Sequence, residues 1–183
     1  MPKPELKSGL AKKLEEYRAA RAFNPEEWSK KKCTLLNEYM AKCGLKSTVT
    51  SISGGVDSAV TLALCHAAKK MQDSPIKTNV GVCQPIHSSA WALNRGKEVI
   101  AAFEGTKEVV VDQSSIHDQL STIVDKAAGI DGNSFAKGQL RSYMRTPVGY
   151  YVAQLFSSKG EPAIVMGTGN QDEDGYLAYF CKA

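Results

Sequence analysis

Two short segments hold most of the residues that could do chemistry. The first is Ser53–Ser58 (SGGVDS), and the second is Gly167–Gly175 (GTGNQDEDG). In the first segment, small residues let the backbone turn tightly and approach a ligand closely. Backbone N–H groups in such a turn, at the start of a helix, attract anions. Ser53 and Ser58 add hydroxyl donors, so the pattern predicts a phosphate-binding loop.

The loop differs from the two commonest phosphate-binding motifs. It lacks the lysine of GxxxxGK[ST], and it is not GxGxxG. It contains Asp57, whose carboxylate would repel phosphate unless a divalent cation lay between them. Mg²⁺ binds carboxylate and phosphate oxygens together. We therefore expect Asp57 to be a metal ligand; the alternative is a Gly-Gly turn capped by serine and aspartate.

The second segment combines close backbone approach with negative charge. Gly167 and Gly169 leave room beside the backbone, and Thr168 offers a hydroxyl. Three carboxylates follow at positions 172–174, which makes this segment a candidate for a second metal contact. An acidic surface turn is the competing interpretation.

The elements that must position these segments alternate along the chain. Hydrophobic periodicity predicts helices and β-branched runs predict strands. Asn24 is expected to cap a helix beginning at Pro25, and Pro147 to break or kink the last helix, with Thr146 as a new N-cap. The expected helices cover residues 4–21, 25–43, 56–72, 89–103, 115–127 and 137–158, and the expected strands cover 47–53, 78–84, 107–112 and 162–166.

This alternation predicts an α/β fold: a doubly wound, mostly parallel, Rossmann-like sheet with helices on both faces. Ligands of such sheets bind at the carboxyl ends of the strands. Both segments lie directly after predicted strands, so the two sets of polar residues are expected to meet at one edge of the sheet.

Composition and charge exclude several classes of protein. The chain has 183 residues, 43% of them apolar and 23% charged, and no apolar run reaches the roughly 20 residues of a membrane span. The N-terminal residues lack the apolar stretch of a secretory signal. Residues 1–32 hold nine Lys/Arg against five Asp/Glu, which accounts for the whole net charge of +4. Because the charges alternate in sign along helical patterns, we expect a solvated helix face and neither a nucleic-acid partner nor a membrane.

The five cysteines and three histidines suggest no site of their own. An odd number of cysteines without CxxC argues against a disulfide framework or a cysteine zinc site, and favours a reducing, cytoplasmic location. His66 and His117 lie in predicted helices and are expected to pack there. His87 lies nearer the expected site.

The two segments together resemble a known family. SGGVDS resembles the PP-loop of the ATP pyrophosphatase superfamily, and with GTGNQDE it resembles the synthetase domain of NAD synthetases, over about residues 35–183. The resemblance implies the adenine nucleotide alpha hydrolase-like fold. It implies ATP-dependent amidation of deamido-NAD to NAD through an adenylate, with release of AMP and pyrophosphate. ATP would be a co-substrate and Mg²⁺ the cofactor.

The resemblance also implies residue roles. Asp57 and Glu173 would hold Mg²⁺, and Lys182 would contact deamido-NAD. Tyr143 stands where the family carries a substrate-binding arginine, so Arg141 or Arg145 would substitute, and Cys83 stands where many bacterial members have arginine. None would act as acid, base or nucleophile, because positioning and charge neutralisation suffice. The residues implied to bind ATP are Ser51, Ile52, Ser53, Gly54, Gly55, Val56, Asp57, Ser58, Gln84, Ser89 and Thr168.

The implied organisation is a helical segment over residues 1–45 followed by the PP-loop domain over residues 46–183. Family members carry a further C-terminal portion, so the chain is expected to be incomplete and to be inactive alone. No glutaminase domain fits within the N-terminal residues, which favours free ammonia as the nitrogen donor, and the family implies a homodimer. The alternatives are another PP-loop enzyme, GMP synthetase-like or tRNA-modifying, and a non-catalytic nucleotide-binding fragment.

Overall fold

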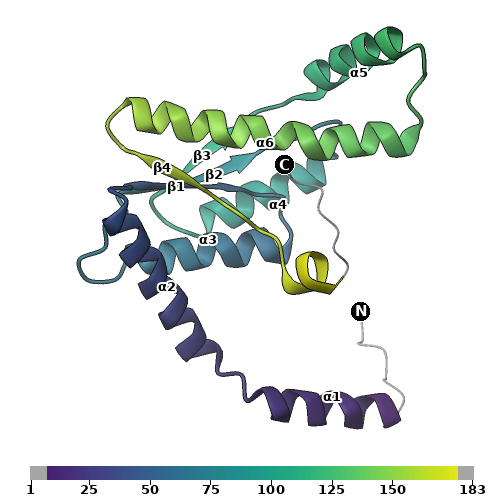
Figure 1. Cartoon of the computed structure of the whole chain (residues 1–183). Coiled ribbons are helices and arrows are strands. Elements are labelled where there is room, and N and C mark those ends of the chain that lie inside the picture. Colours follow the sequence, from purple (N-terminus) through teal and green to yellow (C-terminus); the bar gives the residue numbers. More distant parts are fainter. Residues whose placement is uncertain (1–7, 177–183) are drawn as a thin grey trace.

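The computed structural model of the chain describes residues 8–176 and shows an α/β fold with a four-stranded sheet (Figure 1). The helices are α1 (Ser8–Arg21), α2 (Pro25–Lys42), α3 (Val56–Lys69), α4 (Ala90–Ala101), α5 (Ser114–Ala128), α6 (Ser134–Ser158) and the π-helical turn η1 (Asp172–Tyr176). The strands are β1 (Ser47–Ser51), β2 (Thr78–Cys83), β3 (Thr106–Val110) and β4 (Ala163–Met166).

All the strands pair in parallel, in the order β3-β2-β1-β4. The chain moves outward from β1 to β3 and then crosses back, through α5 and α6, to place β4 on the other side of β1. The strand order therefore reverses between β1 and β4. In a doubly wound sheet this is the place where a crevice opens at the carboxyl edge. The predicted fold class is confirmed.

Helices cover both faces of the sheet (Figure 1). α3 and α4 pack on one face, and α6 packs on the other against β1 and β4. Val49, Val80 and Val82 meet Val152 and Ala153 of α6 in a buried cluster. On the opposite face, α2 joins α3 in a second cluster, made by Cys33, Met40, Ala68 and Ile76. Whether residues 1–45 form a separate segment stays a prediction.

The predicted N-terminal cap of α2 is confirmed. The side chain of Asn24 accepts hydrogen bonds from the N–H groups of Glu26 and Glu27, and Pro25 is the first helical residue. Gly44 follows α2 with φ of +69°, a conformation in which glycine avoids the strain of a Cβ atom. Among the described residues, no helix combines the length and the apolar character that crossing a membrane requires.

The expectation about Pro147 is wrong in one respect. α6 continues through Pro147, so Thr146 lies inside the helix and is not a new N-cap. Proline removes one helical hydrogen-bond donor, but the residues on either side of it remain packed against β1 and β4 and against α5. The turn η1 is a further difference, because no pattern in the sequence predicts a helical turn there.

Glu161 joins the amino ends of two strands, at the edge opposite to the crevice. Its Oε2 accepts hydrogen bonds from Ser47 Oγ of β1 at 3.0 Å and from Thr78 Oγ1 of β2 at 2.8 Å. These bonds hold the pKa of Glu161 below its ordinary value. The residue precedes β4 by a few positions, so it connects the strands that meet at the centre of the sheet.

Candidate functional site at the carboxyl edge

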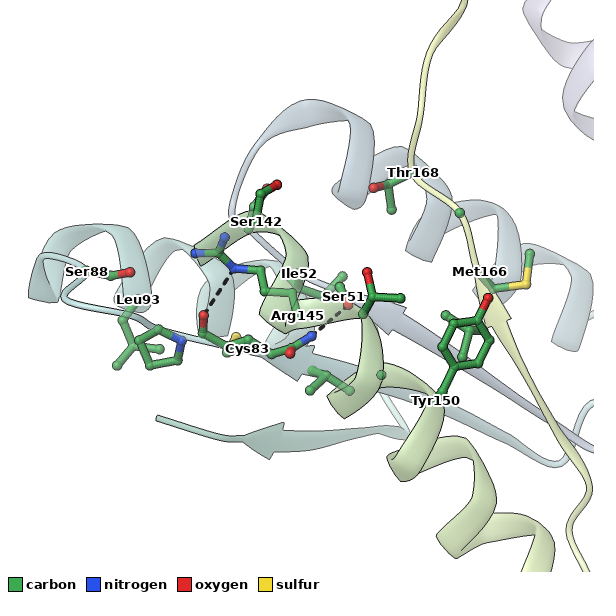
Figure 2. Close-up of a pocket in the computed structure, with 18 of the residues that line it drawn as sticks. Ser51, Ile52, Cys83, Ser88, Leu93, Ser142, Arg145, Tyr150, Met166 and Thr168 are labelled. Carbon is green, nitrogen blue, oxygen red and sulfur yellow. Dashed lines mark hydrogen bonds between the residues drawn. The ribbon is translucent and has the colours of Figure 1, made fainter. Parts of the chain in front are cut away.

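A cavity of about 460 Å³ opens at the carboxyl edge of the sheet, where the strand order reverses. Its walls come from the ends of β1, β2 and β4, the start of α4 and one face of α6. Figure 2 shows Ser88 and Leu93 on one side of it and Tyr150 and Met166 on the other. Arg145 reaches from α6 into the space between them. The predicted position of the site is therefore a real cavity.

The Ser53–Ser58 loop joins β1 to α3 and holds itself together. Ser58 is buried, accepts a hydrogen bond from the N–H of Ser53 and donates one to the carbonyl of Gly55. Ser53 Oγ accepts from the N–H of Gly55. Because Gly55 is the N-cap of α3 and has no side chain, no side chain caps the first turn of α3. Both hydroxyls thus stiffen the loop, and the amides of the first turn remain for a ligand.

Gly54 is required for a second reason besides ligand approach. Its φ is +82°, and a Cβ atom at this position would lie 3.0 Å from Cβ of Arg95 and 3.1 Å from the backbone nitrogen of Gly96. Gly96 is equally crowded, since its own Cβ would lie 3.0 Å from Sγ of Cys83. The backbones of the loop and of α4 therefore approach each other, and the end of β2, so closely that only glycine fits at both positions. This close packing fixes the loop against the sheet.

A chain of buried amides fixes the floor of the cavity. Gln113 donates from Nε2 to Oε1 of Gln84 at 2.9 Å. Gln84 donates from Nε2 to Ser51 Oγ at 2.9 Å, which is the dashed line that ends at Ser51 in Figure 2. Both glutamines are buried. Gln84 and Ser51 both line the cavity, and the Ser51 hydroxyl lies at the end of this chain of hydrogen bonds.

Arg145 is the cation of the cavity. It donates to the carbonyl oxygens of Gln84 at 3.4 Å and of Arg141 at 3.0 Å, and it takes part in none of the ion pairs formed among the described residues. Burial, and secondarily the charge of Arg141, lowers its pKa, although a guanidinium stays protonated in proteins. A half-buried cation without a carboxylate partner favours an anionic ligand.

The two predicted segments touch each other beside the cavity. Nδ2 of Asn170 donates to Oδ1 of Asp57 at 3.3 Å, while Oδ1 of Asn170 accepts from the N–H groups of Asp172 and Glu173. Asn170 thus caps the start of η1 and connects it to the loop. The exposed carboxylates of Asp57 and Glu173 are hard oxygen donors, which suits Mg²⁺ better than a softer metal.

The structure distributes the predicted residues in three groups. Those that line the cavity are Ser51, Ile52, Ser53, Gln84, Arg145 and Thr168. Those that do not line it are Gly54, Gly55, Val56, Asp57, Ser58, Ser89, Arg141 and Glu173. Lys182 lies outside the described residues. Ser89 caps α4 through its Oγ, whereas the neighbouring Ser88 lines the cavity.

Sequence reasoning missed one wall and one support of the site. Ser142, Thr146, Gly149 and Tyr150 line the cavity together with Arg145, at the three- and four-residue spacing of one helix face. That spacing is visible in the sequence, but the expected break at Pro147 divided it. Gln113 lies shortly after β3. Its place after a predicted strand is a sequence signal for a site residue, the same signal that points to the two motif segments.

Most of the chain matches a single protein family. A family model described as NAD synthase matches residues 28–182. The chain belongs to the NAD synthase family. Curated relatives include the NH₃-dependent NAD⁺ synthetase of Pyrobaculum aerophilum, 31% identical over 80% of this chain and 50% of the relative. That of Methanosarcina mazei is 28% identical over 80% of this chain and 53% of the relative. The chain spans about half the length of these relatives.

Solved structures with the same fold include two synthetases with different names. The NH₃-dependent NAD synthetase of Campylobacter jejuni has a TM-score of 0.71 and is 20% identical, over 86% of this chain and 62% of that one. The NMN synthetase of Francisella tularensis has a TM-score of 0.70 and is 21% identical, over 86% and 59%. At these identities the likeness shows the fold alone.

Proposed function

We propose that the protein is an ammonia-dependent NAD synthetase. It would amidate deamido-NAD to NAD, using ATP to convert the nicotinate carboxylate into an adenylate and then ammonia to displace AMP. The observation that carries this proposal is the convergence of Ser53, at the start of the Ser53–Ser58 loop, with Thr168 and Arg145 on one cavity, in a chain of the NAD synthase family.

The loop side of the cavity suits the ATP phosphates. Ser51, Ser53 and Thr168 line the cavity. The first-turn amides of α3, which have no capping side chain, follow Ser53 closely in the chain. Attack of the carboxylate on the α-phosphorus breaks its bond to the leaving pyrophosphate, so negative charge grows on the leaving oxygens. Fixed N–H donors stabilise that charge without reorganisation.

Asp57 and Glu173 would hold the Mg²⁺ that accompanies ATP. The ion would neutralise charge on the phosphate oxygens when bound. Both carboxylates are exposed, and the segments that carry them are already joined through Asn170. Asn170 therefore acts as a positioning residue that holds η1 beside the loop.

The α6 side of the cavity suits the nicotinate substrate. Arg145 would bind an anionic group of deamido-NAD and thereby replace the arginine that the family carries at the position of Tyr143. Tyr143 is 48% exposed and does not line the cavity. Arg141 lies one helical turn before Arg145, and its backbone carbonyl accepts a hydrogen bond from the Arg145 guanidinium. Lys182 keeps its proposed contact with deamido-NAD as a prediction.

We also propose a cytoplasmic location for the protein. The four cysteines among the described residues are free thiols, three of them buried, in keeping with a reducing cytoplasm. We propose free ammonia as the nitrogen donor and a homodimer as the assembly.

The deciding experiment is NAD formation from deamido-NAD, Mg²⁺-ATP and ammonium, measured on this chain and on a C-terminally extended version. Product from either establishes the function, and product from the extended version alone places missing catalytic parts beyond residue 183. Nicotinate mononucleotide serves as the competing substrate, because a synthetase of the same fold is named for NMN. Amidation of that mononucleotide alone would overturn the choice of deamido-NAD. ATP binding without any amidation would favour a non-catalytic nucleotide-binding protein.

Asp57→Asn tests the metal role separately. We expect Mg²⁺ to increase the affinity of the parent chain for ATP. The ratio of ATP affinities with and without Mg²⁺ should be about tenfold smaller in the variant, a difference of about 1.4 kcal/mol in binding free energy. Titration calorimetry with and without Mg²⁺ measures it. Asp73→Asn, an exposed aspartate before β2, is the matched control. An unchanged Mg²⁺ dependence in Asp57→Asn would remove Asp57 from the metal site.

A further inference from the structure

His87, His117 and Asp118 bring their ligand atoms together outside the cavity. His87 lies in the loop between β2 and α4, and the other two lie near the start of α5. Nε2 of His87 is 2.7 Å from Oδ1 of Asp118, and Nδ1 of His117 is 3.1 Å from the same oxygen. Over the described part of the chain, this is the only group of three or more His, Cys, Asp or Glu with ligand atoms within 4.8 Å of one another.

The backbone holds His87 in this position at an energetic cost. Its φ is +52°, in the left-handed region, which is uncommon for residues other than glycine. Its N–H donates to Ser114 Oγ at 2.9 Å, at the start of α5. The two imidazole rings stand edge to face, with centroids 5.7 Å apart. A strained residue held by tertiary contacts is a feature of functional sites.

The hydrogen bonds of His117 determine which nitrogen is available. Nε2 lies 3.2 Å from the backbone carbonyl of Lys137, which can only accept, so Nε2 carries the hydrogen. In the neutral ring, Nδ1 then presents a lone pair to the carboxylate oxygen of Asp118. Two acceptors at 3.1 Å require a proton or a metal cation between them. A backbone carbonyl behind the second nitrogen is also the usual support of a metal-bound histidine.

We propose that His87, His117 and Asp118 bind a divalent transition-metal cation of the zinc class. The ligands would be Nε2 of His87, Nδ1 of His117 and Oδ1 of Asp118. Two imidazoles and one carboxylate are a zinc donor set, and exposure of His87 and Asp118 leaves a fourth position for water. Bonds of about 2.0–2.1 Å in a tetrahedron separate ligand atoms by about 3.3 Å. The two nitrogens, at 2.7 and 3.1 Å from Oδ1 of Asp118, would move slightly away from that oxygen, and they already lie within 4.8 Å of each other.

The cation would fasten α5 to the loop that borders the cavity. Pro85 and Ser88 of that loop line the cavity on either side of His87 in sequence, and Gln113 immediately precedes α5. This site is separate from the hard oxygen donors Asp57 and Glu173, and its softer nitrogen ligands select a different metal. Its role is to hold the β2–α4 loop in place.

The test is Zn²⁺ binding to the chelator-treated chain, measured by competition with a chromophoric chelator. The background is Cys43→Ser, because Cys43 is an exposed free thiol and thiolates are zinc ligands in general. We expect one equivalent of Zn²⁺, and at least tenfold weaker binding in His87→Asn and in Asp118→Asn. Asparagine tolerates the positive φ of position 87, and Asp118→Asn keeps the shape of an exposed side chain, so both variants should fold.

His66→Asn is the matched control, since His66 lies on α3 and packs against Phe103. Its zinc affinity should equal that of the parent. The melting temperature gives a second readout: Zn²⁺ should raise it in the parent and in His66→Asn, and leave it unchanged in the two ligand variants. Equal zinc affinity in all the chains, or no stoichiometric binding in the parent, would overturn the proposal and leave a hydrogen-bonded cluster only.

Discussion

At the level of single residues, the site depends on side chains whose polar groups are already directed. Ser51, Gln84 and Gln113 form one hydrogen-bonded chain, so the hydroxyl at its end is held without help from a ligand. Arg145 differs, because backbone carbonyls are its only hydrogen-bond partners among the described residues. Its guanidinium keeps donors free for an anion, so it is the residue at which the substrate proposal is most sharply tested.

Arg145→Met should weaken binding of deamido-NAD by about 10- to 100-fold, since a hydrogen bond to a charged group contributes about 1.5–3 kcal/mol. Methionine fills much of the same space and removes the charge. Calorimetric titration of the chain with deamido-NAD measures the change.

The matched control is Arg141→Met, one helical turn away and outside the cavity. Its affinity for deamido-NAD should stay within about threefold of the parent's. If Arg141→Met weakened binding as much as Arg145→Met, the effect would belong to the net charge of α6 and not to contact with the substrate.

At the level of elements, close packing of α4 on the sheet positions the loop. Gly81 of β2 lies under α4, where a Cβ atom would come within 2.6 Å of Cγ1 and 2.8 Å of Cδ1 of Ile100. Gly81→Ala should therefore lower the free energy of unfolding by about 1–3 kcal/mol through overpacking. Urea denaturation gives the value.

Gly138→Ala should change the free energy of unfolding in the opposite direction. Gly138 lies in α6, and a Cβ atom added there would meet nothing within 4 Å, so alanine should raise stability by up to about 1 kcal/mol through helix propensity. Equal effects of the two substitutions would contradict the packing argument.

Glu161, at the amino ends of the strands, should make the stability of the fold depend on pH. Hydrogen bonds from Thr78 and Ser47 lower the pKa of Glu161 from 4.5, so the folded state favours the carboxylate. Its stabilising effect is present above pH 4.5 and is lost as the pH falls through the lower folded pKa. Glu161→Gln should therefore have a lower urea midpoint than the parent at pH 7, and the gap should close in acid. A gap of constant size from about pH 7 to about pH 3 would show that the charge of Glu161 is irrelevant.

Sequence reasoning reached the elements more completely than the site. Strand–helix alternation and the cap at Asn24 are local signals, and the structure confirms them. The wall formed by α6 depends on which face of a long helix meets the sheet, and a proline in the middle hides this. The contact of Asn170 with Asp57 joins residues far apart in the chain, so only the folded sheet reveals it.

At the level of the whole molecule, α5 presents an apolar stripe to solvent. Ile116, Leu120, Ile123 and Val124 follow helical spacing and are exposed. Such a surface is typical of a protein interface, and it supports the proposed homodimer.

Ile116→Asp combined with Ile123→Asp should shift the chain from dimer to monomer, because each charge would be desolvated at the interface. Sedimentation equilibrium measures the association. Leu10→Asp, a change at an exposed leucine of α1, should leave the dimer intact. A parent chain that is monomeric at high concentration would contradict the proposal directly.

The position of β1 between β2 and β4 also determines when the protein can finish folding. Ser47 pairs with Thr78 on one side and with Ala163 on the other, so the second partner is synthesised more than a hundred residues after β1. At a ribosomal rate of about 5–20 residues per second, β1 waits about 5–20 seconds for this second partner. Thr168 follows β4, so the nascent chain completes the cavity at the carboxyl edge only after nearly all of the described residues have been made.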